Sequence, residues 1–210
     1  MQKMIVPAIL TQSKQELMAM CTLCSGFCNY AQIDIMDGKF VSSKSIVIND
    51  MSNLRLSIKN EAHLMVEKPL EWLGMFKNLG TRRIIFHFEI KENHEKVIKE
   101  IKTAGFEAGI AINPDTKISA LEHLLVLVDS VLFMSVIPGF YGSKFIPEVL
   151  DKISKFKKLY PEKCTGIDGG LKLDNITRVM ASGADYACVG SAILKAKNPK
   201  AAYLAFKEKL

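Results

Sequence analysis

The feature that most constrains the fold is the regular alternation of apolar, strand-like runs with helix-like segments along the chain. Nearly all-apolar strands are typical of parallel sheets covered on both faces, and strand–helix alternation indicates the same arrangement. The first turn, A-I-L-T-Q-S, contains no glycine, which disfavours an open dinucleotide-binding sheet. Eight such units predict an α/β fold, a single (β/α)8 TIM barrel with a parallel eight-stranded sheet. The predicted strands are Met4–Leu10, Tyr30–Met36, Asn60–Met65, Arg83–Phe88, Ala108–Ile112, Ser130–Met134, Cys164–Ile167 and Tyr186–Val189.

A helix is predicted after each strand. The first opens with Ser13 and Glu16 in capping-box spacing. Four glycines are predicted to close helices as left-handed caps, namely Gly26, Gly80, Gly105 and Gly183. The predicted helices are Ser13–Cys24, Ile46–Arg55, Leu70–Leu79, His94–Ala104, Ile118–Leu127, Lys144–Tyr160, Leu173–Ser182 and Pro199–Leu210.

Composition indicates one domain over residues 1–210, because 210 residues that are 49% hydrophobic can bury one sizeable core. No apolar stretch approaches the length of a membrane span, and the first ten residues lack the order of a signal peptide, which predicts a cytoplasmic protein without membrane association. The net charge of +6 is modest and its lysines fall on predicted outer helices. This pattern favours a small anionic metabolite as ligand over nucleic acid.

Cys21, Cys24 and Cys28 have a spacing that invites a zinc interpretation. No second C-x-x-C follows and no fourth ligand is evident, so we expect buried core thiols instead. Cys164 and Cys188 fall inside predicted strands and are expected in the core as well.

Two carboxylate motifs lie at strand ends more than a hundred residues apart. Asp34 is in I-D-I-M-D-G and Asp168 is in G-I-D-G-G. In a barrel these acids face each other across the mouth, where one can remove a proton and the other can deliver one to the opposite face of a flat intermediate. This arrangement suits an epimerase or a racemase. The developing negative charge needs hydrogen-bond donors or a metal ion, and His63, one strand from Asp34, is a candidate ligand for zinc, manganese or iron.

Glycine-containing loops predict a phosphate site at the same rim. Such barrels commonly bind phosphate with backbone N–H groups after strands seven and eight. The loop P-G-F-Y-G-S, between Pro138 and Pro147, resembles a lid with glycine hinges. The expected phosphate and substrate contacts are Gly169, Gly170, Gly190 and Ser191 in the first group, and Gly139, Phe140, Tyr141 and Gly142 in the lid loop.

Three further histidines have less distinctive settings. His87 and Glu89 close the fourth strand, where they either polarise a substrate or form a hydrogen-bonded pair. His94 and His123 fall on predicted outer helices and are expected at the solvated surface.

A series of motifs runs in order from about Pro7 to Leu194: P-A-I-L, D-I-M-D-G-K-F-V, A-H-L-M-V, F-H-F-E, G-I-A-I-N-P-D-T, F-M-S-V-I-P-G-F-Y-G-S-K-F-I-P, I-D-G-G and V-G-S-A-I-L. In order and spacing this series resembles the ribulose-phosphate 3-epimerase family. The resemblance implies a barrel that interconverts ribulose 5-phosphate and xylulose 5-phosphate, with Asp34 and Asp168 as acid/base pair and metal ligands, His63 as a further ligand, and a homo-oligomeric assembly. It also implies a thioether lining around the enediolate from Met36, Met65 and Met134, which composition alone would place in the core.

The sequence departs from the family pattern at several positions. Gln32 stands where the family has a metal-binding His, and its neutral amide oxygen is a weaker ligand, or none, so the divalent metal is expected to be weakly bound. The other departures are Ala8 for a substrate-contacting Ser, Lys39 for His, Ile137 for Asn and Tyr141 for Gly.

Three interpretations therefore stay open. The first is an active sugar-phosphate 3-epimerase with an altered metal site. The second is an epimerase of another ketose phosphate, such as a hexulose 6-phosphate. The third is a catalytically impaired barrel that binds a phosphorylated ligand, which retention of both acids disfavours.

Overall fold

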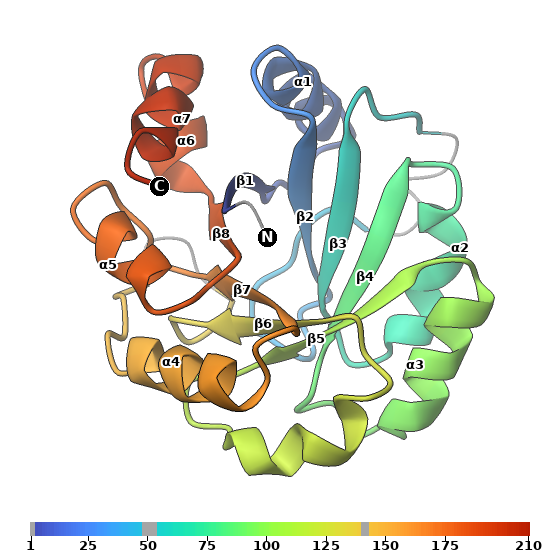
Figure 1. Cartoon of the computed structure of the whole chain (residues 1–210). Helices are drawn as coiled ribbons and strands as arrows, with labels where there is room; N and C mark the ends of the chain where they lie inside the picture. The colour runs from blue at the N-terminus through green and yellow to red at the C-terminus, as the bar shows by residue number, and fades with distance from the viewer. Residues whose placement is uncertain (1–2, 48–53, 140–142) are drawn as a thin grey trace.

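The computed structural model describes residues 3–47, 54–139 and 143–210. These residues form a closed barrel whose eight parallel strands follow one another in sequence order, with helices around the outside (Figure 1). The prediction of a (β/α)8 TIM barrel is confirmed. The strands are β1 (Met4–Ile9), β2 (Tyr30–Met36), β3 (Lys59–Met65), β4 (Thr81–His87), β5 (Glu107–Ile112), β6 (Ser130–Met134), β7 (Cys164–Asp168) and β8 (Tyr186–Val189).

The predicted strands match the observed ones to within one or two residues at each end. Strand β1 stops at Ile9, and β7 extends to Asp168. The barrel closes by parallel pairing of β1 with β8, from Met4 opposite Tyr186 to Pro7 opposite Val189. Closure leaves no free sheet edge, so the strand ends form one continuous rim.

The outer layer departs more from prediction. Residues 48–53 of the predicted helix Ile46–Arg55 lie outside the described residues, and its described ends are not helical. The backbone N–H of Ile46 instead donates to the carbonyl of Thr11, which ties this segment to the first loop. The helical elements are α1 (Lys14–Ser25), the 3-10 helix η2 (Pro69–Trp72), α2 (Leu73–Phe76), α3 (His94–Thr103), the 3-10 helix η3 (Ile118–Leu124), α4 (Val149–Leu159), α5 (Ile176–Ala181), α6 (Ser191–Leu194) and α7 (Pro199–Lys207).

Several predicted helices differ from the observed elements in type or extent. Leu70–Leu79 is divided into η2 and α2, and Leu173–Ser182 is shortened to α5. Two other differences, at Ile118–Leu127 and Lys144–Tyr160, have identifiable reasons. In η3 the core-facing residues Ile118, Leu121 and Leu124 recur every three positions, which matches the three residues per turn of a 3-10 helix. Helix α4 begins at Val149 rather than Lys144, just after Pro147, which has no N–H for a helix interior.

The predicted caps are mostly confirmed. Ser13 accepts the backbone N–H of Glu16 at the start of α1. Gly80, Gly105 and Gly183 have positive φ angles, as expected of left-handed caps, whereas Gly26 has φ −76°. The prediction for Gly26 was wrong because its N–H reaches back to α1 in a right-handed turn.

Two apolar layers hold the barrel together. The larger lies between strands and helices, and it includes the buried Cys21 and Cys24. A smaller cluster fills the barrel interior and includes Tyr186 and the buried Cys188. The core expectation is thus confirmed for these three cysteines, whereas Cys28 and Cys164 are only half-buried.

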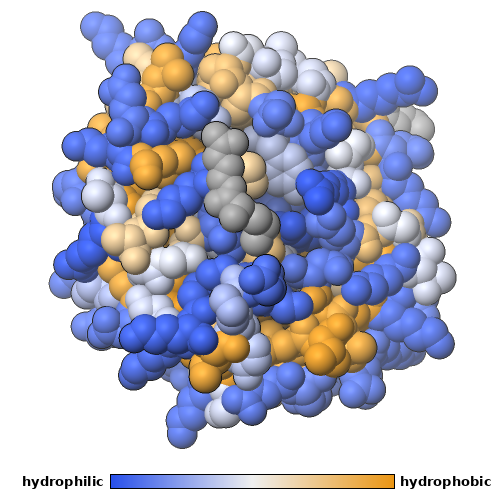
Figure 2. Space-filling view, in the orientation of Figure 1, coloured by the Kyte–Doolittle hydropathy of each residue, from blue (hydrophilic) through white to orange (hydrophobic). Residues whose placement is uncertain are grey.

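In the described part of the chain, no helix is both long and apolar enough to cross a bilayer. The face shown in Figure 2 is largely hydrophilic, with hydrophobic residues in separate patches.

Candidate functional site

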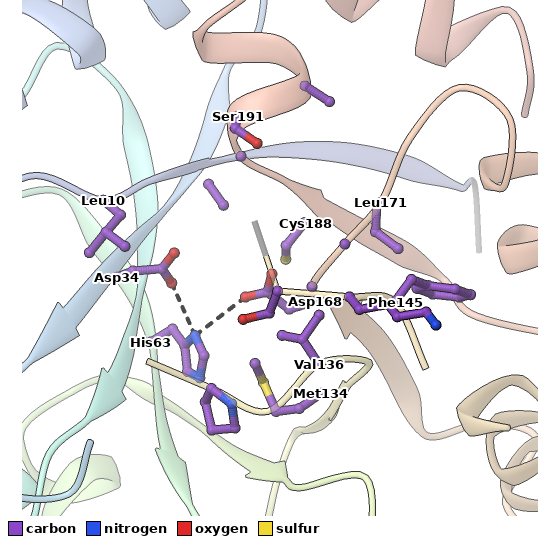
Figure 3. Close-up of a pocket in the computed structure, with 18 of the residues that line it drawn as sticks. Leu10, Asp34, His63, Met134, Val136, Phe145, Asp168, Leu171, Cys188 and Ser191 are labelled. Carbon is purple, nitrogen blue, oxygen red and sulfur yellow. Dashed lines mark hydrogen bonds and ion pairs between the residues drawn. The ribbon is translucent and has the colours of Figure 1, made fainter. Parts of the chain in front are cut away.

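The two acids and the histidine predicted from the sequence lie together at the carboxyl end of the strands. Asp34 on β2 is paired in register with His63 on β3, and Asp168 is the last residue of β7. His63 Nδ1 lies 3.0 Å from Asp34 Oδ1 and 3.4 Å from Asp168 Oδ2 (Figure 3). One ligand atom from each residue falls within 4.8 Å of the others, and among the described residues this is the one such His/Cys/Asp/Glu group.

Gln32 lies one pleat below Asp34 on the same face of β2. Its Nε2 donates to Asp34 Oδ1 at 2.8 Å and to Asp168 Oδ2 at 2.7 Å, and the side chain is fully buried. Its Oε1 accepts from Cys188 Sγ at 3.0 Å. The amide therefore presents its N–H group, rather than its oxygen, to the acid pair.

Burial and mutual proximity set the charges of the group. Burial, together with the negative charge of Asp168, raises the pKa of Asp34. Burial alone would lower the pKa of His63, but hydrogen bonds to Asp168 and Asp34 outweigh it and raise that pKa to about 9. A positive charge on His63 thus balances the negative charge of the acid pair. A divalent cation bound by these three residues would do the same.

A second histidine lies behind His63. His63 Nε2 is 2.9 Å from His87 Nε2, and His87 Nδ1 is 3.2 Å from Glu89 Oε2, so the hydrogen-bonded pair considered for His87 and Glu89 is present. Burial lowers the pKa of His87 to about 4, which keeps this imidazole neutral.

The two helix histidines differ in their surroundings. His123 is exposed, as predicted. His94 lies on an outer helix as predicted but is only half-exposed: its Nε2 lies 2.6 Å from the carbonyl oxygen of Phe88, and its ring stacks on that phenyl ring at 4.7 Å. These contacts shield part of the imidazole from solvent.

A cavity of about 750 Å³ opens above the acid pair. Its wall contains Ala8 and side chains that sequence reasoning did not assign to the site, including Lys144, Lys172 and Cys188. Cys188 was missed because thiols inside strands are usually core, although its register position beside Asp168 is a usable signal. The predicted residues found in this wall are Asp34, His63, Asp168, Met36, Met65, Met134, Gly139, Gly169, Gly170, Gly190 and Ser191.

Gly169 and Gly170 have φ angles of 115° and 64°. A Cβ on Gly169 would lie 2.5 Å from a methyl of Val136, and one on Gly170 would lie 3.0 Å from the Cα of Phe145. Only glycine therefore fits both positions, and their backbone comes close to the cavity.

The departures from the family pattern are unevenly placed. Ala8 lines the cavity and Gln32 contacts both acids. Ile137 is 69% exposed and Lys39 lies in a separate small cavity, so neither belongs to the described wall. Tyr141 lies outside the described residues, as do Phe140 and Gly142.

The fold and the site place this chain among the (β/α)8 barrels that carry polar side chains at the carboxyl ends of their strands. Residues 4–194 match the family described as "Ribulose-phosphate 3 epimerase family". The chain is 32% identical to the ribulose-phosphate 3-epimerase of Mycobacterium leprae, over 100% of this chain and 96% of that protein. It is 37% identical to the ribulose-phosphate 3-epimerase of Aquifex aeolicus, over 80% of this chain and 78% of that protein. The chain belongs to the ribulose-phosphate 3-epimerase family, and it is an enzyme of the isomerase class, a carbohydrate phosphate epimerase.

Solved structures show the same fold at low sequence identity. The 3-hexulose-6-phosphate synthase of Salmonella typhimurium superposes with a TM-score of 0.71 at 15% identity, covering 99% of this chain and 98% of that one. The tryptophan synthase α-subunit of Pyrococcus furiosus gives 0.70 at 14% identity, over 100% and 98%. At such identities the likeness concerns the barrel alone.

Proposed function

We propose that this protein interconverts ribulose 5-phosphate and xylulose 5-phosphate by inverting the configuration at C3. The observation that carries the proposal is the placement of Asp34 and Asp168 on well-separated strands, within reach of one imidazole, beneath a cavity with glycine-lined loops. The family membership supports the same reaction.

The two acids would perform the proton transfers. One carboxylate removes the C3 proton, and the bond's electron pair forms the C2–C3 double bond of an enediolate whose negative charge rests on the oxygen at C2. The other acid, protonated beforehand, delivers its proton to the opposite face of C3. The raised pKa of Asp34 favours a state in which the pair carries one proton, which this exchange requires. Gln32 holds both carboxylates in place through its amide N–H group.

The residues present fit a divalent cation. Asp34, His63 and Asp168 offer two carboxylate oxygens and one imidazole nitrogen within 4.8 Å of one another, a donor set that suits zinc, manganese or iron. When bound, such a cation would stabilise negative charge on the enediolate oxygens. The N–H orientation of Gln32 supports a weakly held ion, since no fourth ligand faces the group from that side. The thioethers of Met36, Met65 and Met134 would cover the enediolate with apolar surface.

The phosphate would lie at the loops after β7 and β8. Backbone N–H groups at Gly169, Gly170, Gly190 and Ser191 would donate to it, with positive charge from Lys144 and Lys172 in the same cavity wall. The proposed substrate is thus a small anionic sugar phosphate. The lid loop would cover it, with Gly139 in the described wall. We further propose a cytoplasmic homo-oligomer, by analogy with the family.

One observation favours a second substrate. Ala8 lines the cavity where the family pattern has the larger and polar Ser, which leaves room for a longer sugar. A hexulose 6-phosphate is the alternative, and comparing kcat/KM for the two ketose phosphates decides between them.

The test is exchange of the C3 proton of ribulose 5-phosphate with solvent deuterium, followed by NMR together with xylulose 5-phosphate formation. Asp34→Asn and Asp168→Asn are expected to lose about a hundred- to ten-thousandfold in the rate of xylulose 5-phosphate formation, as removal of a general acid or base does. The variant that keeps the acid facing the C3 proton of ribulose 5-phosphate is expected to retain exchange of that proton without inversion. Asp174→Asn is the matched control, because this acid lines the cavity but lies outside the acid pair. Near-normal xylulose 5-phosphate formation in either site variant would refute the two-acid mechanism. A folded wild type inactive on both ketose phosphates would leave the impaired-barrel alternative.

A further inference from the structure

A row of polar groups, His87 and Glu89, lies behind His63. His87 on β4 is fully buried, and its Nε2 lies 2.9 Å from His63 Nε2. Its Nδ1 lies 3.2 Å from Glu89 Oε2. Neither His87 nor Glu89 lines the cavity, so neither contacts a substrate there.

Only one arrangement of protons satisfies these contacts when His63 Nδ1 serves as a ligand. A ligand nitrogen must carry a free lone pair, so the proton of neutral His63 lies on Nε2. That proton requires an acceptor, which is His87 Nε2. His87 then carries its own proton on Nδ1 and donates it to the carboxylate of Glu89. In the opposite tautomer of His87, the unprotonated Nδ1 would face the Glu89 carboxylate. Its Nε2–H would face the Nε2–H of His63.

The end of the row is fixed by the loop after β5. Glu89 Oε1 accepts the backbone N–H of Asn113 at 2.8 Å and also the hydroxyl of Thr116. The Glu89 carboxylate thus has a set position, with its other oxygen left for His87.

Ring packing fixes the middle of the row. The His87 ring stacks on His63 with centroids 5.1 Å apart, and Phe40 covers it at 4.8 Å. Water is therefore poorly placed to replace His87 as acceptor.

We propose that His87 and Glu89 are positioning residues that hold His63 in the tautomer with a free Nδ1, so that it can join Asp34 and Asp168 in binding a divalent cation. This inference rests on the cation site of the proposed function. A histidine ligand commonly donates its second N–H to a carboxylate or a carbonyl. Here an imidazole stands between the ligand and the carboxylate.

The probe is Co(II), titrated into the purified full chain and followed by its visible spectrum and by competition with a chelator. His87→Phe keeps the ring packing but removes the acceptor, and it is expected to weaken Co(II) binding about 10–100-fold. His87→Gln restores an acceptor oxygen near the position of Nε2, and its Co(II) affinity is expected within about threefold of wild type. Equal losses in both variants would mean a packing role only, and no loss in His87→Phe would overturn the proposal.

A second variant tests the far end of the row. In Glu89→Gln the amide N–H group faces either the N–H at His87 Nδ1 or the donors of Asn113 and Thr116. In both orientations two hydrogen-bond donors face each other without an acceptor. Weaker Co(II) binding is expected, whereas Glu95→Gln, the same change at an exposed position of α3, should bind Co(II) as wild type does. Should His87→Phe fail to fold, unchanged Co(II) binding in Glu89→Gln would still overturn the proposal.

The nitrogen-15 NMR signals of the imidazoles in Zn(II)-loaded protein give an independent readout. Wild type is expected to show His63 protonated at Nε2, and loss of that signal in His87→Phe but not in His87→Gln supports the role. A wild type that binds Co(II) in this pattern but does not epimerise ribulose 5-phosphate would refute the proposed function alone. An active wild type whose His87→Phe variant binds Co(II) equally well would refute the positioning role alone.

Discussion

Replacing Gln32 by His tests how far this site departs from a full cation site. In wild type the Gln32 amide donates to Asp34 and Asp168, and its oxygen accepts from Cys188. For the oxygen to face a cation, the amide must turn over, which gives up the Cys188 contact and sets N–H against the thiol. A neutral hydrogen bond of this kind contributes about 1 kcal/mol.

Imidazole has no such cost and is the better ligand for zinc-like ions. Turning a weak ligand or outer partner into a proper ligand changes cation affinity about 10–100-fold, which corresponds to about 1–3 kcal/mol. We therefore expect Gln32→His to bind Co(II) or Mn(II) tighter by that factor.

The assay is a competition titration with a chelator, run beside the epimerase assay with and without chelator. Gln15→His is the matched control, because Gln15 is exposed on α1 and a histidine there reports adventitious binding. A wild type that already holds one tightly bound ion, and gains nothing from Gln32→His, would refute the reasoning. Chelator-insensitive activity in wild type, with flat or lower activity in Gln32→His, would instead assign the Gln32 N–H group to stabilising the enediolate.

Two further predictions follow from the loops and from the row behind His63. Gly170→Ala forces a side chain to φ 64° and sets its Cβ 3.0 Å from the Cα of Phe145, so KM for the sugar phosphate should rise about tenfold or more. The control Gly74→Ala, whose added Cβ meets open space, should leave KM unchanged. Equal KM values in both variants would contradict the phosphate assignment. Although burial alone would raise it, hydrogen bonds from His87 and the loop after β5 lower the pKa of Glu89 to about 2. Because the folded-state pKa is depressed, this carboxylate stabilises the fold above its ordinary pKa near 4.5 and loses that effect as the pH falls towards 2. Urea unfolding should show Glu89→Gln less stable than wild type by about 1–2 kcal/mol at pH 7, because solvent screens this partly exposed carboxylate, with a difference that shrinks from pH 4.5 downwards; a difference independent of pH would refute this.

The barrel and its acid pair were predictable because both depend on local patterns. Strands buried on two faces leave long apolar runs, and an acid at the end of such a run must lie on the rim of a closed barrel. Asp34 and Asp168 therefore lie close together as expected, with His63 in contact with both. The position of Gly169, Gly170 and Gly190 in the cavity wall was predictable for the same reason, since they follow the last two strands directly.

The contact of His87 with His63 was not predictable, because it depends on a register shift between β3 and β4. Asn60 is opposite Thr81, yet Glu61 is opposite Arg83, so one residue is skipped. Side chains alternate between faces along a strand, and a one-residue slip moves the whole set to the other face. The shift thus brings Arg83 to Glu61, at 3.1 Å, and sets His87 on the same face as His63.

The direction of the Gln32 amide was likewise beyond sequence reasoning, because its partners come from three strands. Its N–H group meets acids on β2 and β7, and its oxygen meets the thiol of Cys188 on β8. The family resemblance implies a weak or absent ligand at Gln32 but does not say which end of the amide faces the acids.

Register explains why this position matters. Along β2 and β3 the inward-facing residues pair in three successive layers: Gln32 with Glu61, then Asp34 with His63, then Met36 with Met65. The middle layer holds Asp34, which would transfer a proton, beside His63, and the upper one supplies apolar cover next to the cavity. The lowest layer is fully buried and does not line the cavity, and its Gln32 contacts both acids from below, whereas Glu61 pairs with Arg83. A substitution in that layer changes the charge balance and ligand supply of the acid pair while leaving the substrate-facing wall intact. The departure at Gln32 is therefore expected to act on cation affinity, and through it on kcat, more than on KM.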